Sequence, residues 1–219
     1  MKLDKAQLQQ IQRFLDRMEL HQEDLKNEVL DHMALSIEGH LDRGTPFNEA
    51  FALVRNTWQG ELKLHQSFWL GLLWTGPKIL MDKCAQLTKR AYLRSAIWAL
   101  LPMGVIYVFG KGLPMALWEA ANTAVGGMYL LFFSWLLYAN VRIRATKRKS
   151  SYRFLFKVHA IAFGFLLVLY NPLFSDIFGL VQDGAMSMPA LAVHAFTLAF
   201  CYSLVRFYQL HMQIKWKPV

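Results

Sequence analysis

Four long apolar stretches, separated by short polar connections, occupy the chain between residues 94 and 210. Lipid cannot hydrate a charge or an unpaired peptide group, so a segment that spans a bilayer must be an apolar helix of roughly 20 residues. We predict such helices over about 95–112, 114–139, 153–173 and 187–209, with a kink at Pro102 in the first. The predicted fold class is all-α, with residues 94–219 forming a four-helix transmembrane bundle.

Residues 1–65 show a different pattern, in which apolar residues recur at helical spacing among polar ones. This pattern predicts a cytoplasmic domain of three short helices. Asp4, with Gln7 three residues later, is typical of a first N-cap. The second helix is predicted to begin near Gln22 or Glu23 and to stop at Gly44. Thr45-Pro46 predicts a cap followed by proline at the first helical position of the third helix, which ends near Gly60. The apolar faces comprise Leu8, Ile11, Phe14, Leu15 and Met18; then Leu25, Val29, Leu30, Met33, Ile37 and Leu41; then Phe47, Ala50, Phe51, Val54 and Trp58.

The connector over residues 66–93 begins with an apolar, tryptophan-rich run that Gly76-Pro77 interrupts after about ten residues. A helix of that length rises about 15 Å, half the hydrocarbon thickness, so it cannot span. We predict an interfacial helix on the inner leaflet, with a re-entrant hairpin as the alternative. A new helix starting at Pro77 would run on into the first span. The apolar residues of the interfacial helix are Phe68, Trp69, Leu70, Leu72, Leu73 and Trp74, and the basic residues after Pro77 are Lys83, Lys89, Arg90 and Arg94.

The formal net charge of +9 is unevenly distributed along the chain. Residues 1–65 carry 8 Lys and Arg against 11 Asp and Glu, whereas residues 66–219 carry 16 against 4. Basic loops stay on the cytoplasmic side of a membrane, which predicts an inner-membrane protein with both termini inside. The basic residues that border the spans predict contact with anionic lipid head groups rather than with nucleic acid. The second connection holds Arg142, Arg144, Lys147, Arg148, Lys149, Arg153 and Lys157, the first holds Lys111, and the third holds Asp176 and Asp183.

Cysteine use and the N-terminus add little chemistry. Cys84 lies before the spans and Cys201 inside the last one, so we expect neither a disulfide nor a metal site. The N-terminus opens a polar amphipathic segment rather than a signal region, and the first span is expected to direct insertion. We expect no cofactor, because no nucleophile elbow, phosphate-binding loop or Cys-x-x-Cys occurs.

Polar residues inside the spans are the strongest site candidates, because lipid makes them costly. Glu119 lies about five residues into the second span and His194 about six or seven into the fourth, from the same side. Their similar depth predicts a Glu119–His194 pair, which Asn122 extends one turn further in. Such a site is either proton-responsive or ligand-binding, since histidine titrates near neutral pH, or it has a structural explanation. The structural explanation is a hydrogen bond that sets helix register, or a Glu119 near enough to the outer interface to reach water. His159 is expected to lie too deep to join it.

Small residues suggest where helices approach closely. The second span has such a face, and the fourth has a weaker one. These residues are Ala120, Asn122, Thr123, Ala124, Gly126 and Gly127 on the second span, and Ala195 and Ala199 on the fourth.

One motif lies in the N-terminal domain, where Glu28-Val29-Leu30-Asp31-His32 is followed by Ile37-Glu38, Gly44, Phe47 and Glu49-Ala50-Phe51. Over residues 5–58 this resembles an α-helical prefix domain found ahead of bacterial permeases and small multi-span proteins, and the helical domains associated with PadR-type regulators. Val29 departs from the leucine of the motif. The whole architecture is similar to uncharacterised multi-span membrane proteins of Bacteroidota-like bacteria. The resemblance implies a cytoplasmic regulatory or interaction module and no catalytic residues.

Within this motif Glu28, Asp31, His32 and Glu38 are the candidate functional residues, because i, i+3 and i+4 positions are neighbours on a helix. A zinc site needs three or four convergent ligands, and no His-Glu-x-x-His pattern occurs. The favoured interpretation is structural: the Asp-His pair bonds to another helix or caps a terminus.

These patterns predict a non-enzymatic signalling, regulatory or assembly component whose N-terminal domain binds a protein partner. The alternative is a small transporter or channel, built by oligomerisation, that uses Glu119 and His194. A membrane-embedded enzyme ranks third.

Overall fold

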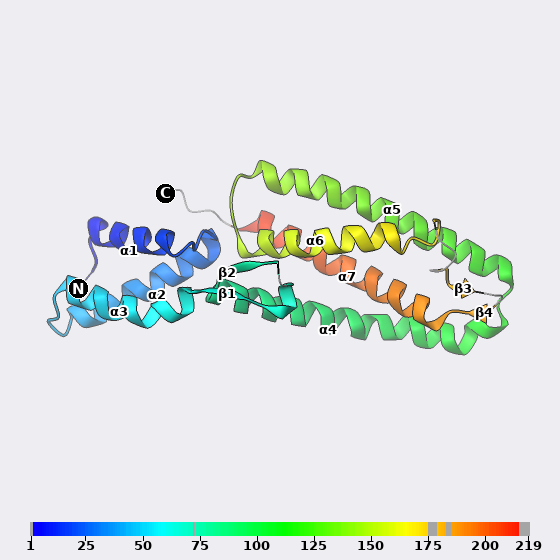
Figure 1. Cartoon of the computed structure of the whole chain (residues 1–219), viewed down its shortest axis with the longest axis horizontal. Helices are drawn as coiled ribbons and strands as arrows, with labels where there is room; N and C mark the ends of the chain where they lie inside the picture. The colour runs from blue at the N-terminus through cyan, green and yellow to red at the C-terminus, as the bar shows by residue number, and fades with distance from the viewer. Residues whose placement is uncertain (1, 72, 175–178, 183–184, 215–219) are drawn as a thin grey trace. The chain divides into compact units, whose positions relative to one another are not determined.

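The computed structural model describes residues 2–71, 73–174, 179–182 and 185–214, and it is all-α apart from two short hairpins (Figure 1). Three residues named above, Leu72, Asp176 and Asp183, lie outside the described residues. The chain divides into two compact units. The N-terminal unit comprises residues up to 88 together with 148–154, and the apolar-helix unit comprises 89–147 together with 155–215.

Three amphipathic helices form the core of the N-terminal unit: α1 (Lys5–Arg17), α2 (Glu23–Leu41) and α3 (Phe47–Leu62). The predicted cap of α1 is confirmed, because Asp4 and Gln7 form a reciprocal capping box. Gly44 follows α2 at φ 84°, a conformation that favours glycine. The predicted cap at Thr45 is wrong, since Pro46 is the N-cap and α3 begins one residue later. The buried core consists of Ile11, Leu15, Leu20, Leu25, Val29, Met33, Ile37, Ala50, Phe51, Val54 and Leu62.

The predicted interfacial helix after this core is a β-hairpin instead. Strands β1 (Leu64–Gln66) and β2 (Thr75–Pro77) pair antiparallel, and η1 (Phe68–Leu70) is a single 3-10 turn between them. Gly71 stands at φ 90°, outside helical geometry, which ends the turn. Phe68 and Leu73 of the connection are exposed, at 82% and 94%, whereas Leu70 is buried.

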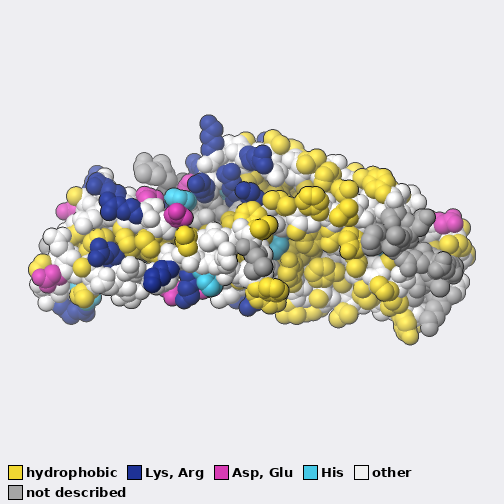
Figure 2. All heavy atoms as spheres, viewed as in Figure 1, with side chains coloured by type: hydrophobic (Ala, Val, Ile, Leu, Met, Phe, Trp, Pro, Cys, Tyr) yellow, Lys and Arg dark blue, Asp and Glu magenta, His cyan; other side chains and the backbone are white. Residues whose placement is uncertain are grey.

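Among the described residues, four helices are long and apolar enough to cross a membrane: α4 (Lys78–Phe109), α5 (Met115–Ala145), α6 (Ser151–Leu169) and α7 (Met188–Gln213). Helix α4 starts directly after Pro77 and runs without a break through Pro102, as predicted for a connector helix continuous with the first span. The connection between α4 and α5 contains η2 (Gly110–Gly112), and that between α6 and α7 contains β3 (Val181–Gln182) and β4 (Ala185–Met186). Hydrophobic side chains cover much of the visible surface of these helices (Figure 2).

Helix α7 packs against both α4 and α5 inside the apolar-helix unit. Its Phe200 ring stacks on Phe163 of α6 with centroids 4.2 Å apart and contacts Tyr92 of α4 at 5.1 Å. His159 is buried among these rings, 5.3 Å from Phe200, and so belongs to an aromatic core.

Candidate functional site

The predicted pairing of Glu119 with His194 is not observed in the described structure. Glu119 is exposed on α5, while His194 is 2% exposed and its Nδ1 lies 2.7 Å from the hydroxyl oxygen of Tyr129. Tyr129 lies ten residues beyond Glu119, which is about 15 Å along the helix axis. His194 is therefore held by a group far deeper in the unit than Glu119.

Helices α5 and α7 do not begin at the same level, so Glu119 and His194 lie at different depths although each is close to the start of its helix. Asn122, one turn after Glu119, accepts a hydrogen bond at Oδ1 from the backbone N–H of Leu180, at 2.8 Å. The carbonyl of Leu180 in turn accepts from the N–H of Ser187, the N-cap of α7. The connection before α7 thus lies against the second turn of α5, and α7 starts deeper. Asn122 holds this connection and does not extend a network to His194.

Gly126 provides a close approach, although to a connection rather than to a neighbouring helix as predicted. Its carbonyl accepts a hydrogen bond from Asn171 Nδ2 at 3.4 Å, and Asn171 is fully buried just beyond α6. A Cβ atom on Gly126 would lie 2.3 Å from Leu173 Cγ. The small residue at 126 therefore lets the residues after α6 fold against α5.

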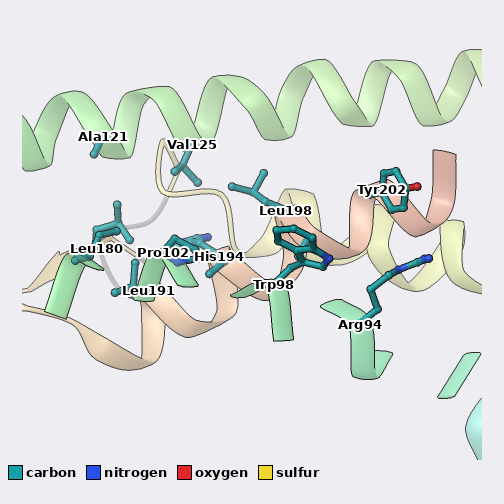
Figure 3. A pocket seen from close by; sticks show the side chains of 13 residues that line it. Arg94, Trp98, Pro102, Ala121, Val125, Leu180, Leu191, His194, Leu198 and Tyr202 are labelled. Atoms are coloured by element: carbon teal, nitrogen blue, oxygen red, sulfur yellow. The ribbon is translucent and has the colours of Figure 1, made fainter. Parts of the chain in front are cut away.

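A cavity of about 770 Å³ opens between α4, α5 and α7, and His194 forms part of its wall (Figure 3). Most of its lining is apolar. Arg94 and Tyr202 lie at one end, and Leu180, Leu191, Pro102 and His194 lie towards the other. The predicted small residues Ala195 and Ala199 line this groove. The complete lining is Arg94, Trp98, Pro102, Ile106, Ala121, Val125, Leu180, Leu191, His194, Ala195, Leu198, Ala199 and Tyr202.

Among the described residues of the groove wall, Arg94 is the one Lys or Arg, and two contacts orient its side chain. Its Nη2 donates a hydrogen bond to Ser203 Oγ at 2.9 Å, and its guanidinium carbon lies 5.0 Å from the centre of the Tyr202 ring. In the described part of the chain no carboxylate forms an ion pair with Arg94. A guanidinium has five N–H donors, so donors remain for a further acceptor.

The candidate residues of the N-terminal motif are spread over the surface of α2. Asp31 and His32 are exposed, and neither side chain makes the predicted bond to another helix within the described structure. Glu28 pairs with Lys83 at 3.2 Å, and a Glu38 carboxylate oxygen accepts from the N–H of Leu3 at 3.0 Å. No group of three or more potential metal ligands gathers among the described residues.

A more extensive contact lies at the start of α2, where the segment before α6 meets it. The carbonyl of Lys149 accepts a hydrogen bond from Glu23 N at 3.0 Å, and this caps α2, whose N-cap Gln22 has no side-chain cap. Conversely, Asp24 Oδ1 accepts from Ser151 N, the first residue of α6, at 2.9 Å, and Asp24 Oδ2 accepts from the Ser151 hydroxyl. Carboxylates are favourable at helix N-termini. The two helices therefore cap each other.

Two residues of α4 complete this contact within the N-terminal unit. Lys83 lies 3.9 Å from an Asp24 oxygen as well as beside Glu28. The buried thiol of Cys84 lies 3.9 Å from the carbonyl oxygen of Ser151. Asp24 and Glu28 of α2 thus contact Lys83 of α4, and Asp24 also contacts the start of α6, which follows a basic connection.

Sequence reasoning missed Tyr129, Trp98 and Tyr202, and the role of Arg94 in the groove. The signal for Tyr129 was present, because Asn122, Gly126 and Tyr129 lie at helical spacing on one face of α5. Arg94, Trp98, Pro102 and Ile106 likewise recur every four residues on α4.

Comparisons with family models, curated proteins and solved structures find no match for this chain. The resemblance of residues 5–58 to the permease-prefix motif therefore stays a prediction.

Proposed function

We propose that the chain is an integral, multi-pass protein of a bacterial inner membrane, with both ends in the cytoplasm. The four long apolar helices support a membrane location. The concentration of Arg and Lys between α5 and α6, set against few charges in the connections on the other side, supports the orientation.

Within that frame, the protein acts as a non-enzymatic signalling, regulatory or assembly component whose N-terminal unit binds a protein partner. The observation that carries this proposal is the mutual capping of α2 and α6. The first turn of α2 has one N–H capped by the segment before α6, and the first residue of α6 has its N–H capped by Asp24 of α2. A partner that displaces the start of α2 therefore removes caps from α6 as well, which provides a route between partner binding and the membrane helices.

A shallow groove between α2 and α3 supports the choice of the N-terminal unit as the partner-binding part. It is lined by Ser36, His40, Leu53, Val54, Thr57 and Trp58, and Leu53 is 53% exposed. An exposed leucine beside a part-buried tryptophan is the kind of anchor that protein interfaces use. The transport alternative needs Glu119 and His194 together, and no described contact favours it.

The test uses the full-length chain in its membrane, because α2 needs Lys149 for its cap. A photo-crosslinking amino acid replaces Leu53, and in a matched variant it replaces Arg13, which is exposed on α1. We expect one defined protein, identified by mass spectrometry, to crosslink from position 53 and not from position 13, and to bind the purified chain. Absence of any partner, together with ion or proton flux in vesicles that Glu119→Gln abolishes, would instead support transport.

A further inference from the structure

The groove between α4, α5 and α7 runs along the direction of the apolar helices. On α4 its wall extends from Arg94 to Ile106, which is twelve residues or about 18 Å. One leaflet of a bilayer accounts for about 15 Å of the roughly 30 Å hydrocarbon core. The groove is thus about as long as one leaflet is deep, with its charged group at one end.

The composition of the groove changes along this length. Trp98, Pro102, Ile106 and Leu198 make its walls apolar beyond the first turn. Ala195 and Ala199 also line the groove, and their side chains are small. His194 is the polar group at depth, and its Nδ1 is already hydrogen bonded to Tyr129. An occupant must therefore be apolar over most of its length and polar at the end near Arg94.

The charge at the polar end of the occupant follows from the distribution of acids. In the described part of residues 89–214, Glu119 is the only carboxylate, and it lies near the start of α5. Arg94 lies far from Glu119, because it is 15 residues, or about 22 Å, before the end of α4, whereas Glu119 is close to the connection that joins α4 to α5. A second copy of these helices in the same orientation would place no carboxylate at this level. The missing anion must come from elsewhere.

A phospholipid head group supplies an anion at this depth. Its phosphate offers oxygens to the planar fork of a guanidinium, which can bind two of them at once. Ser203 and Tyr202 hold the fork in place, so little side-chain freedom is lost on binding.

We propose that this groove binds one acyl chain of an anionic phospholipid whose phosphate group is hydrogen bonded and paired to Arg94. The leaflet is the one at whose surface the basic connection between α5 and α6 lies. This site goes beyond the proposed function and does not depend on the identity of a protein partner.

Native mass spectrometry of the full-length purified chain, titrated with phosphatidylglycerol or phosphatidylcholine of identical acyl chains, tests the proposal. We expect the wild-type chain to retain one phosphatidylglycerol in preference to phosphatidylcholine. Arg94→Gln should reduce that preference about tenfold, as expected for loss of a hydrogen bond to a charged group. Arg90→Gln is the matched control, since Arg90 is exposed one turn earlier on α4 and outside the groove. Its preference should equal that of the wild type.

Two further variants separate the groove from the charge. Ala199→Phe fills the groove and should lower retention of both lipids, whereas Leu131→Phe, at a position 74% exposed on α5, should not. Ser203→Ala removes the hydrogen bond to Arg94 but keeps its charge, and it should largely keep the preference for phosphatidylglycerol. Circular dichroism and gel filtration verify that each variant is folded.

A second readout needs no variant of Arg94. Phosphatidylglycerol brominated on its acyl chains should quench tryptophan fluorescence in vesicles more than brominated phosphatidylcholine does, and Trp98→Phe should remove the difference. The proposal is overturned if Arg94→Gln leaves the lipid preference unchanged, or if Ala199→Phe leaves retention unchanged. It is equally overturned if a dimer without lipid occupies the groove, seen as a doubled mass that Ala199→Phe disrupts.

Discussion

At the scale of single residues, the apolar-helix unit depends on contacts that leave no space for an added atom. A Cβ on Gly126 would meet Leu173 Cγ at 2.3 Å and Asn171 Oδ1 at 2.7 Å, whereas a Cβ on Gly127 would meet nothing within 4 Å. Two adjacent glycines of one helix therefore have different roles, which a sequence cannot reveal because both belong to the same small-residue face.

This difference gives a paired experiment. We expect Gly126→Ala to lower the free energy of unfolding by about 1–3 kcal/mol, because the connection after α6 must move away from α5. Gly127→Ala should leave stability unchanged or slightly raised, since alanine favours a helix. Thermal unfolding of the two variants in the same detergent measures the difference. Equal effects would show that residues 171–173 do not pack on Gly126.

The Tyr129–His194 hydrogen bond is a second residue-scale feature. Tyr129→Phe keeps the ring but leaves the buried Nδ1 of His194 without this bond, and we expect a loss of about 1–3 kcal/mol. Tyr138→Phe is the control, because Tyr138 is 56% exposed on the same helix. Chemical denaturation in detergent compares the two. Indistinguishable midpoints would contradict the assignment of Tyr129 as the group that holds His194.

The predicted pair of Glu119 with His194, which is not observed, shows what the sequence could and could not reveal about single residues. The buried residues of α5 recur at helical spacing through Trp118, Val125 and Tyr129, and Glu119 lies off that stripe. The stripe was visible in the sequence, so the exposure of Glu119 was predictable. The level at which α7 begins was not predictable from the sequence. It depends on a hydrogen bond that the backbone N–H of Leu180 donates to Asn122, and these two residues are 58 positions apart in the chain.

At the scale of elements, the helices follow from periodicity and caps, whereas the connector does not. The three N-terminal helices and the four apolar helices lie where their patterns predict. The segment over 67–74 is apolar but short, and a helix there would need Gly71 in a conformation it does not adopt. The segment is instead enclosed by two short strands, in which Leu64 pairs with Pro77. No sequence pattern links these two residues, so their pairing was not predictable.

The mutual capping of α2 and α6 predicts an unequal response of two aspartates on one helix. Asp24→Ala removes the acceptor for Ser151 N, and we expect a loss of about 1–2 kcal/mol. Asp31→Ala, at an exposed position of α2, should change stability by less than about 0.5 kcal/mol. Hydrogen exchange of the first turns of α2 and α6 should increase together in Asp24→Ala. Faster exchange in α2 alone would contradict a shared cap.

At the scale of the whole molecule, composition and charge predict more than any single residue does. The four apolar helices that the sequence predicts are present, and helix α4 joins the connector to the first of them without interruption. Which side of a membrane each connection faces rests on the bias of Arg and Lys alone.

Thiol labelling tests this orientation. In a chain with the buried cysteines replaced, Cys84→Ala and Cys201→Ala, a single new cysteine is introduced as Lys147→Cys or as Gly112→Cys. We expect an impermeant maleimide to label the Gly112 variant in spheroplasts, in which the outer membrane no longer bars the reagent, and the Lys147 variant only after lysis. Labelling of the Lys147 variant in intact spheroplasts would contradict the proposed orientation, and with it the proposal that the N-terminal unit is cytoplasmic.

The shared cap also has a consequence for biosynthesis. Asp24 leaves the ribosome 127 residues before its partner Ser151, and two apolar helices are made in the interval. The first turn of α2 therefore lacks its hydrogen bond to Lys149 until α4 and α5 have been synthesised. A nascent chain arrested before residue 149 should hold a soluble portion that proteases cut more readily near residue 23 than in the finished protein.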